Sequence, residues 1–249
     1  MSLVIKIDKV SKKYAKNYKS ALKLLKRDLL NSIFCSKENF SFKCEKNEFL
    51  VINNISFEIY KNERVAILGS NGAGKSTLLK MIFGIILPDD GIITVNGVVG
   101  GILELGGGLK NTLSGRENIY YIGSFYGKSK KEIDNMIDEI VEFTDLGEFI
   151  DSPVSFYSSG MKSKLSFALY LYMKPDILVL DEIFATGDKK FRLKAKEKLL
   201  KIVYSSTTIL VSHNIGIVRE IATRVIVLNK GKIIFDGNVD DGIKVYENL

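Results

Sequence analysis

The chain has 249 residues, of which 46% are hydrophobic and 26% are charged, as expected for a globular protein of one large or two small domains. No uncharged apolar run approaches the roughly 20 residues of a membrane span, and the charged N-terminal stretch is unlike a signal peptide. Two cysteines and one histidine argue against a disulfide framework and a histidine-rich metal site, and they favour a reduced, cytosolic protein.

The positive charge of the chain is concentrated near its N-terminus. Residues 1–46 hold 12 lysines and arginines against 4 acidic residues, whereas the rest of the chain holds 24 against 25. A basic segment of this kind either forms a solvated lysine-rich face or meets phosphate groups on nucleic acid or lipid. It does not show the interleaved aromatic pattern of a surface that stacks on single strands, so no nucleic-acid partner is expected.

Taken in chain order, short alternating or apolar runs predict strands, and the segments between them predict helices. The segment from Thr112 to Tyr172 reads as mostly helical, and Asn229-Lys230-Gly231 predicts a hairpin turn. Strands that alternate with helices indicate an α/β domain, here with a helical block inserted between its two halves. The predicted strands cover residues 4–10, 54–60, 64–69, 92–97, 177–180 and 207–212, and both arms of the hairpin at 225–235.

A glycine-rich segment, GSNGAGKST, follows the predicted strand RVAIL and opens a helix-like run. It matches G-x-x-x-x-G-K-[ST] in the strand-then-helix context that this pattern requires, which disfavours a chance glycine turn. The glycines let backbone N–H groups surround the β- and γ-phosphates of a nucleotide, Lys75 supplies a positive charge, and Ser76 offers a hydroxyl to Mg²⁺. The predicted nucleotide-binding residues here are Gly69, Ser70, Asn71, Gly72, Ala73, Gly74, Lys75, Ser76 and Thr77.

Two acidic residues, Asp181 and Glu182, follow the apolar run ILVL. In a phosphate-loop enzyme the first can hold the water shell of Mg²⁺, and the second can polarise the attacking water. The alternative is a pair that only caps the strand, but unpaired carboxylates at the end of an apolar strand cost free energy. His213 follows a second apolar run and is expected to approach the same γ-phosphate, although a single histidine is more often structural.

The stretch YSSGM at 157–161 precedes a helix-like apolar pattern. By itself it predicts a serine N-cap, and a helix N-terminus with small residues also presents N–H groups to an anion. The phosphate loop, this stretch, the acid pair and His213 follow one another in the order and spacing of one family. By these motifs the chain resembles the ATP-binding subunits of ABC transporters over almost its whole length. The resemblance implies the ABC ATPase form of the P-loop NTPase fold, an α/β domain over 1–249 with an antiparallel β subdomain and a helical subdomain at 110–172.

In that family two subunits face each other head to tail, and the signature of one contacts the ATP held by the phosphate loop of the other. The family pattern is Leu-Ser-Gly-Gly-Gln, whereas this chain has Tyr157, Ser158, Ser159, Gly160 and Met161. The resemblance therefore implies ATP and Mg²⁺ as cofactors and a homodimer that forms on ATP binding. In this dimer Ser158, Ser159 and Gly160 would reach the γ-phosphate across the interface.

Three further positions carry expectations from the resemblance. Asp188 lies in the segment that links the two ATP sites, where many members have Ser-Ala-Leu-Asp. The segment GILELGGGL at 101–109 places Glu104 where glutamine is usual, and a carboxylate can accept a contact from water or Mg²⁺ but cannot donate a hydrogen bond. Tyr14, in VSKKY, is the implied residue that stacks on adenine, and a plain tyrosine at a strand end is the alternative.

Within the family, three features resemble the ATPases of polysaccharide exporters, which move O-antigen, teichoic acid or capsule chains. They are LELGGGL followed by LSGREN at 113–118, the signature YSSGM, and a basic insertion at 15–46. The resemblance implies an ATPase that powers export of a lipid-linked cell-surface polysaccharide through a separate polytopic transmembrane subunit. It would act as a peripheral subunit at the cytoplasmic face of the inner membrane, without the C-terminal sugar-binding domain that some members carry.

Residues 20–34, within the basic insertion, predict an amphipathic helix with Ser20 as its N-cap. Such a helix either packs on its own domain or lies against anionic headgroups beside the membrane partner. Its apolar face would hold Leu22, Leu25, Leu29 and Ile33, and its basic face Lys23, Lys26 and Arg27.

Three other functions stay open at this point. The ATPase of another ABC exporter or importer would share the motifs, although the inserted helix and Glu104 argue against it. A soluble ABC ATPase of translation or DNA repair would usually have a second such domain, a long coiled coil or a zinc insertion, and the sequence predicts none of these. The third is a regulatory subunit that binds ATP only as a switch, and intact Lys75, Asp181, Glu182 and His213 weigh against it.

Overall fold

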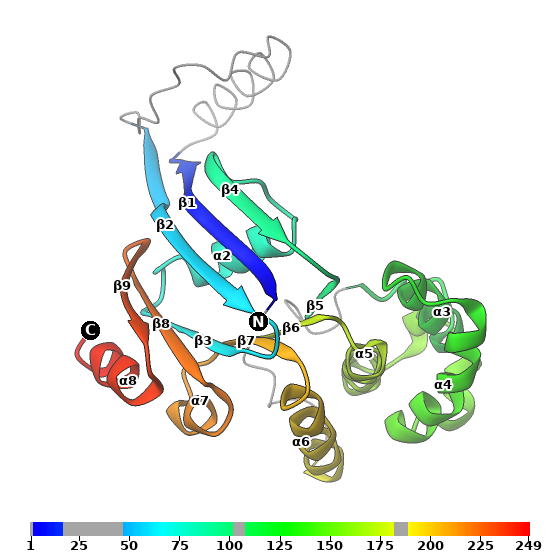
Figure 1. Ribbon diagram of the computed structural model, residues 1–249. Coiled ribbons are helices and arrows are strands. Elements are labelled where there is room, and N and C mark those ends of the chain that lie inside the picture. The colour runs from blue at the N-terminus through cyan, green and yellow to red at the C-terminus, as the bar shows by residue number, and fades with distance from the viewer. Residues whose placement is uncertain (1, 17–46, 102–107, 182–188) are drawn as a thin grey trace. The chain divides into compact units, whose positions relative to one another are not determined.

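The computed structural model describes residues 2–16, 47–101, 108–181 and 189–249 (Figure 1). The chain divides into two compact units. The first unit comprises Met1–Tyr60, Ile67–Asn96 and Val225–Leu249, and the second comprises Lys61–Ala66 and Gly97–Arg224. In the part of the chain that the structure describes, no helix combines the length and the apolar character that crossing a membrane requires.

Strands and helices alternate along the chain, as the sequence predicts. The strands are β1 (Leu3–Ala15), β2 (Glu48–Tyr60), β3 (Arg64–Leu68), β4 (Asp90–Val95), β5 (Val99–Gly101), β6 (Ile177–Asp181), β7 (Thr207–Val211), β8 (Arg224–Asn229) and β9 (Lys232–Gly237). The helices are α2 (Lys75–Ile82), α3 (Gly115–Phe125), α4 (Lys130–Thr144), α5 (Ser159–Met173), α6 (Lys189–Val203), α7 (Ile215–Ile221) and α8 (Val239–Glu247), with short 3-10 helices η1 (Gly147–Asp151) and η2 (Val154–Phe156).

The first unit contains an antiparallel sheet in the order β2-β1-β4 and the antiparallel hairpin β8–β9. Alternate apolar side chains of β1 and β2, among them Ile5, Ile7 and Ile59, are fully buried, which is the pattern of a sheet with one face on a core. Helix α2 contacts β2 and β4 and buries Leu78 and Leu79. This packing gives the start of α2 a rigid support.

The second unit contains parallel strands in the order β5-β6-β7, and the first residues of β3 pair with β7. All five residues of β7 are buried, as are the apolar residues of β6. Strands of parallel sheets are covered on both faces, so a continuous apolar run rather than an alternating one is expected. Asp181 is the last residue of β6, and His213 follows the last residue of β7 by two positions, so both come at the carboxyl ends of these strands.

Between β5 and β6 the second unit is mostly helical, as predicted for the segment from Thr112 to Tyr172. Helices α3 and α4 each begin with a capping box: Ser114 with Glu117, and Ser129 with Glu132. In each box the serine side chain accepts from the backbone N–H of the glutamate, and the glutamate side chain accepts in return from the serine backbone. The motif LSGREN therefore contains a helix start.

Three strands differ most from the sequence expectation. Strand β1 runs to Ala15, past the predicted end at residue 10, and β2 begins at Glu48, before the predicted start at residue 54, because these two extensions pair with each other. The three-residue strand β5 has the sequence VGG, which carries no strand pattern of its own and forms by pairing with β6.

Candidate functional site

The predicted phosphate loop lies in the first unit, between β3 and α2, as its motif requires. Gly69, Gly72 and Gly74 have φ angles of 154°, 79° and 107°, which residues with a side chain rarely adopt. A Cβ atom at Gly74 would lie 2.6 Å from Ile52 Cδ1, and one at Gly69 would overlap the carbonyl oxygen of Leu228. Two of the three glycines are therefore required by close packing as well as by backbone conformation.

Lys75 lies over the loop that precedes it. Its Nζ donates to the carbonyl oxygens of Gly69 at 2.6 Å and Ser70 at 3.1 Å. No side chain caps the N-terminus of α2, and Ser70 and Ser76 are exposed. An uncapped helix start, an adjacent ammonium group and exposed hydroxyls fit the phosphates of a nucleotide.

Tyr14 lies near the end of β1, beside Phe49 of β2, its register partner. The two ring centroids are 6.3 Å apart and the planes are tilted by 37°. Next to them Lys13 and Glu48 form a buried ion pair of 2.8 Å. The position fits the predicted stacking role, and it also fits the alternative of a strand-end tyrosine.

The ends of β6 and β7 lie side by side in the second unit. Asp181 is the last residue of β6 and pairs in parallel register with Val211, the last residue of β7. His213 comes two residues later, is exposed, and precedes Asn214, the N-cap of α7. The structure therefore brings the backbone of Asp181 and the turn with His213 to the same sheet edge.

The predicted signature is the start of α5. Ser158 is the N-cap, and its side-chain oxygen accepts a hydrogen bond of 3.2 Å from the backbone N–H of Met161, so the predicted N-cap is confirmed. Ser158, Ser159 and Gly160 are exposed, whereas Tyr157 is buried. The first turn of α5 is thus open to a partner while the residue before it is held inside.

Several sequence predictions lie outside the described residues. These are Glu104, Glu182, Asp188 and the amphipathic helix expected at 20–34.

The hairpin turn contains a residue that the sequence analysis did not connect with the phosphate loop. Gly231 donates its backbone N–H to the carbonyl oxygen of Ala73 at 3.1 Å, and its own carbonyl accepts from Asn53 at 2.9 Å. Its φ is 76°, and a Cβ atom there would overlap the carbonyl oxygen of Val51. In the sequence, Gly231 indicated only the turn. Its bond to Ala73 could not be predicted, because this bond depends on tertiary packing.

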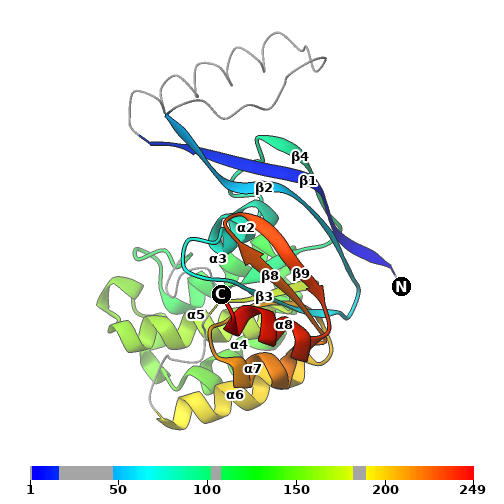
Figure 2. The same ribbon diagram turned by 90° about the vertical axis from the view of Figure 1, so that its left-hand side faces the viewer.

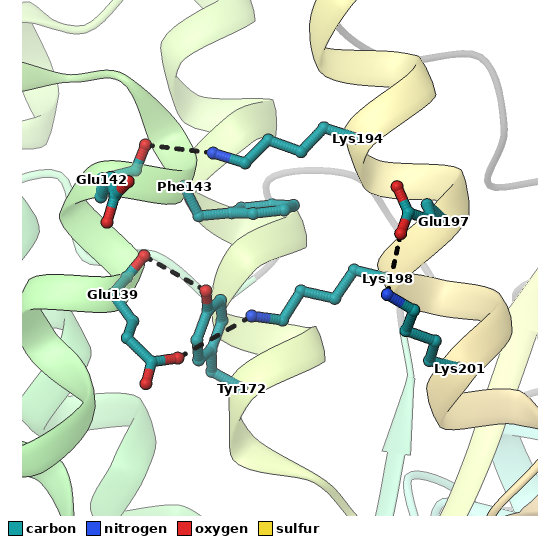
Figure 3. A pocket seen from close by; sticks show the side chains of 8 residues that line it. All are labelled: Glu139, Glu142, Phe143, Tyr172, Lys194, Glu197, Lys198 and Lys201. Atoms are coloured by element: carbon teal, nitrogen blue, oxygen red, sulfur yellow. Dashed lines mark hydrogen bonds and ion pairs between the residues drawn. The ribbon is translucent and has the colours of Figure 1, made fainter.

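A cavity of about 510 Å³ lies among α4, α5 and α6 (Figure 3). Nζ of Lys198 is 3.5 Å from the centroid of the Tyr172 ring and 3.9 Å from a carboxylate oxygen of Glu139. Nζ of Lys194 is 5.0 Å from the centroid of Phe143. These cation–π contacts hold α6 against α4 and α5. The lining comprises Glu139, Glu142, Phe143, Tyr172, Lys194, Glu197, Lys198 and Lys201, none of them a predicted site residue.

Burial, together with the carboxylates of Glu139 and Glu142, raises the pKa of Tyr172 to about 12. A tyrosine in an unfolded chain has a pKa of about 10. The neutral Tyr172 hydroxyl therefore contributes fully to the free energy of unfolding below about pH 10, and this contribution is lost as pH rises from about 10 to 12. We expect the free energy of unfolding of Tyr172→Phe to fall less steeply over this interval than that of the wild type. Urea denaturation at several alkaline pH values measures this, and parallel pH profiles would contradict it.

Comparisons with known proteins agree with the geometry. Residues 52–185 match the family model described as ABC transporter. The O-antigen export system ATP-binding protein RfbB of Klebsiella pneumoniae is 42% identical over 80% of this chain and 82% of that protein. The teichoic acids export ATP-binding protein TagH of Lactococcus lactis is 44% identical over 82% of this chain, but the match spans only 44% of TagH.

A solved structure of an ATP-binding subunit of an ABC transporter shares the fold, with a TM-score of 0.73 over 98% of this chain and 93% of that chain. Its sequence identity is 20%, so the likeness concerns the fold alone. The predicted fold class is confirmed.

Proposed function

Since the chain belongs to the ABC transporter family, we propose that it is the ATP-hydrolysing subunit of an exporter for a lipid-linked cell-surface polysaccharide. The phosphate loop carries the proposal: its glycines, the position of Lys75 and the uncapped start of α2 together suit a triphosphate. Relatives that export O-antigen and teichoic acids support the exporter branch.

Magnesium bound with ATP is part of the proposal. The described residues contain no group of three or more His, Cys, Asp and Glu that could hold a metal ion. Mg²⁺ in ATPases is bound largely by phosphate oxygens and water, with only one or two protein ligands, so this finding is compatible with the ion. Ser76 would be a direct ligand, and Asp181 and Glu104 would hold the ion directly or through its water shell, and the ion would neutralise charge on the phosphates.

The hydrolytic residues follow from the strand ends. Glu182, directly after Asp181, would orient the attacking water and accept its proton. His213 would donate a hydrogen bond to the γ-phosphate from the neighbouring strand end. Tyr14 would stack on adenine, and Asp188 would contact the second ATP site.

The exposed start of α5 supports a dimer. Ser158, Ser159 and Gly160 of one copy would bind the γ-phosphate of the ATP held by the other copy. Hydrolysis adds negative charge repulsion between the products and loosens this interface. The loop around Glu104 would transmit the opening to a polytopic membrane partner, which places this chain at the cytoplasmic face of the cell membrane.

A steady-state assay of phosphate release by the purified chain, alone and with its membrane partner, tests the proposal. We expect ATP-dependent turnover that requires Mg²⁺, and co-purification with a multi-span membrane protein. ATP binding without turnover in both preparations would favour a regulatory ATP switch instead. Turnover by a chain that co-purifies with no membrane protein would favour a soluble ABC ATPase.

The basic segment provides a prediction for the contact with lipid. We expect replacement of Lys23, Lys26 and Arg27 by glutamate to reduce polysaccharide export while ATPase activity of the isolated subunit stays near wild type. The reason is that anionic headgroups attract each cation by about 1 kcal/mol near the surface, and glutamates reverse this attraction. Export measured in cells lacking the wild-type gene, beside ATPase assays of the purified variant, gives the result.

A control with the same change in charge is available elsewhere on the chain. Lys130, Lys131 and Lys232 are exposed, and their replacement by glutamate should leave export unchanged. If cells with the Lys23, Lys26 and Arg27 variant export as much polysaccharide as cells with this control variant, the predicted contact of the segment with lipid is wrong. The segment would then pack on its own domain.

A further inference from the structure

The motif LSGREN at 113–118 is joined to the segment that leads into the signature helix α5. Backbone N–H groups of Val154 and Ser155 donate to the carbonyl oxygens of Leu113 and Asn111, both at 2.9 Å. Each of these bonds links residues about forty positions apart and fixes the residues in front of the signature. The same two segments also meet through the Ser114–Pro153 bridge and the Arg116–Asp151 ion pair.

We call the contact between residues 111–116 and 151–155 the junction. Asn118 bonds to the chain on the α3 side of this junction. It is fully buried, and its side-chain amide donates to the carbonyl oxygens of Lys110, Leu113 and Ser114 at 2.8 to 3.3 Å. Its side-chain oxygen accepts from the backbone N–H of Lys110 at 2.7 Å. A buried amide with all of these bonds holds the chain before α3 in one conformation, so the junction is stiff.

Gly115, the first residue of α3, provides room at this junction for Tyr157. The Tyr157 ring is buried and its hydroxyl donates to the carbonyl oxygen of Phe149 at 2.6 Å. A Cβ atom at position 115 would overlap that hydroxyl oxygen and would lie 2.9 Å from Cδ1 and 3.0 Å from the carbonyl oxygen of Ile150. Gly115 has no left-handed φ, so it is needed for space and not for backbone conformation.

We propose that Gly115 and Tyr157 form a packing contact that positions the signature serine Ser158 for the ATP of the partner copy. The inference rests on the proposed function, because it assigns positioning residues to that same site. Tyr157 directly precedes the N-cap Ser158 and has extended backbone angles, φ −75° and ψ 139°. A displacement of the buried ring that carries the backbone of Tyr157 with it would move Ser158 and the start of α5.

The contact between Gly115 and Tyr157 explains why the tyrosine of YSSGM and the glycine of LSGREN occur together in this chain. A tyrosine at the first signature position is bulkier than the leucine of the family pattern, and its hydroxyl occupies the volume that a side chain at position 115 would take. The glycine of LSGREN and the tyrosine of YSSGM are thus complementary in shape. Substituting one without the other should disturb the site, and substituting both should restore part of it.

The test compares Gly115→Ala, Tyr157→Phe and the double variant. We expect Gly115→Ala to lower kcat of ATP hydrolysis by about tenfold or more, since a displacement of roughly 1 Å in a positioning group can cost on the order of 10²-fold. Tyr157→Phe keeps the buried ring but loses the hydroxyl, with its bond to Phe149 and its interaction with the backbone of Gly115, and should reduce kcat less. The double variant lacks the overlapping oxygen and should recover most of the activity that Gly115→Ala loses, with the contacts to Ile150 limiting the recovery.

A second readout separates positioning from general damage to the fold. The affinity of a single copy for a fluorescent ATP analogue depends on the phosphate loop, so it should stay within about twofold in all three variants. If kcat and affinity fall together in Gly115→Ala, or if the double variant is no more active than Gly115→Ala, the positioning role is wrong. If Gly115→Ala does not fold, failure of Tyr157→Phe to restore a folded, active protein overturns the contact. An inactive wild type would refute the proposed ATPase itself.

Discussion

Replacing Glu182 with glutamine is expected to give a subunit that binds ATP and dimerises but hydrolyses ATP about 10²- to 10⁴-fold more slowly. Glutamine has nearly the same shape and can still hydrogen-bond to water, but it cannot accept the proton of the attacking water at neutral pH. The position follows Asp181, whose backbone is fixed beside Val211 in the parallel sheet. Steady-state phosphate release and size-exclusion chromatography with ATP measure the two properties.

The matched control for this variant is Glu148→Gln, which removes one carboxylate from an exposed residue in η1. It should hydrolyse ATP at the wild-type rate. Turnover near the wild-type rate in Glu182→Gln would show that another residue acts as the general base. A variant that neither binds ATP nor dimerises would show that Glu182 is needed for binding and would also contradict the assignment.

Replacing Lys75 with alanine is expected to weaken ATP binding about 10- to 100-fold, since a hydrogen bond to a charged group contributes roughly 1.5–3 kcal/mol. The substitution also removes two bonds within the loop, from Nζ to the carbonyl oxygens of Gly69 and Ser70. The ammonium would exchange these bonds for phosphate oxygens when ATP binds. Titration with a fluorescent ATP analogue gives the dissociation constant.

Lys80→Ala is the control for that measurement, because Lys80 is an exposed lysine in the last turn of the same helix. It loses the same charge at the other end of α2 and should bind ATP as the wild type does. Equal affinities of Lys75→Ala and Lys80→Ala would exclude a direct phosphate contact by Lys75 and would remove the main support for the proposed function.

Local features of the site could be predicted because their causes are local. The phosphate loop is set by glycines within nine consecutive residues, and the helix that follows begins where the motif places it. The N-cap at Ser158 depends on a hydrogen bond to Met161, three residues away. The hairpin at Asn229-Lys230-Gly231 depends on a turn with two consecutive left-handed residues, Lys230 and Gly231. The strand-then-helix context of the loop, the serine N-cap and the hairpin turn were expected from the sequence, and these three local features are confirmed.

Other features could not be predicted, because they join segments far apart in the chain. The buried side chain of Asn118 within LSGREN, the partnership of Tyr14 with Phe49 and the bond from Gly231 to Ala73 carry no signal in sequence spacing. Strand β5 forms only because β6 lies beside it. Such contacts depend on which surfaces meet when the chain folds, and tertiary packing overrides local propensity at these places.

The residue types and their order predict the chemistry proposed for this protein: a phosphate loop, an acid pair after an apolar run and a serine-rich helix start, in an order that one family shares. How these parts are held could be seen only in the folded chain. A glycine at 115 provides the space into which Tyr157 packs, and a glycine at 231 bonds to the phosphate loop. Reactive groups are recognised by their type and local spacing, whereas their positions depend on steric fit between segments that the chain brings together on folding.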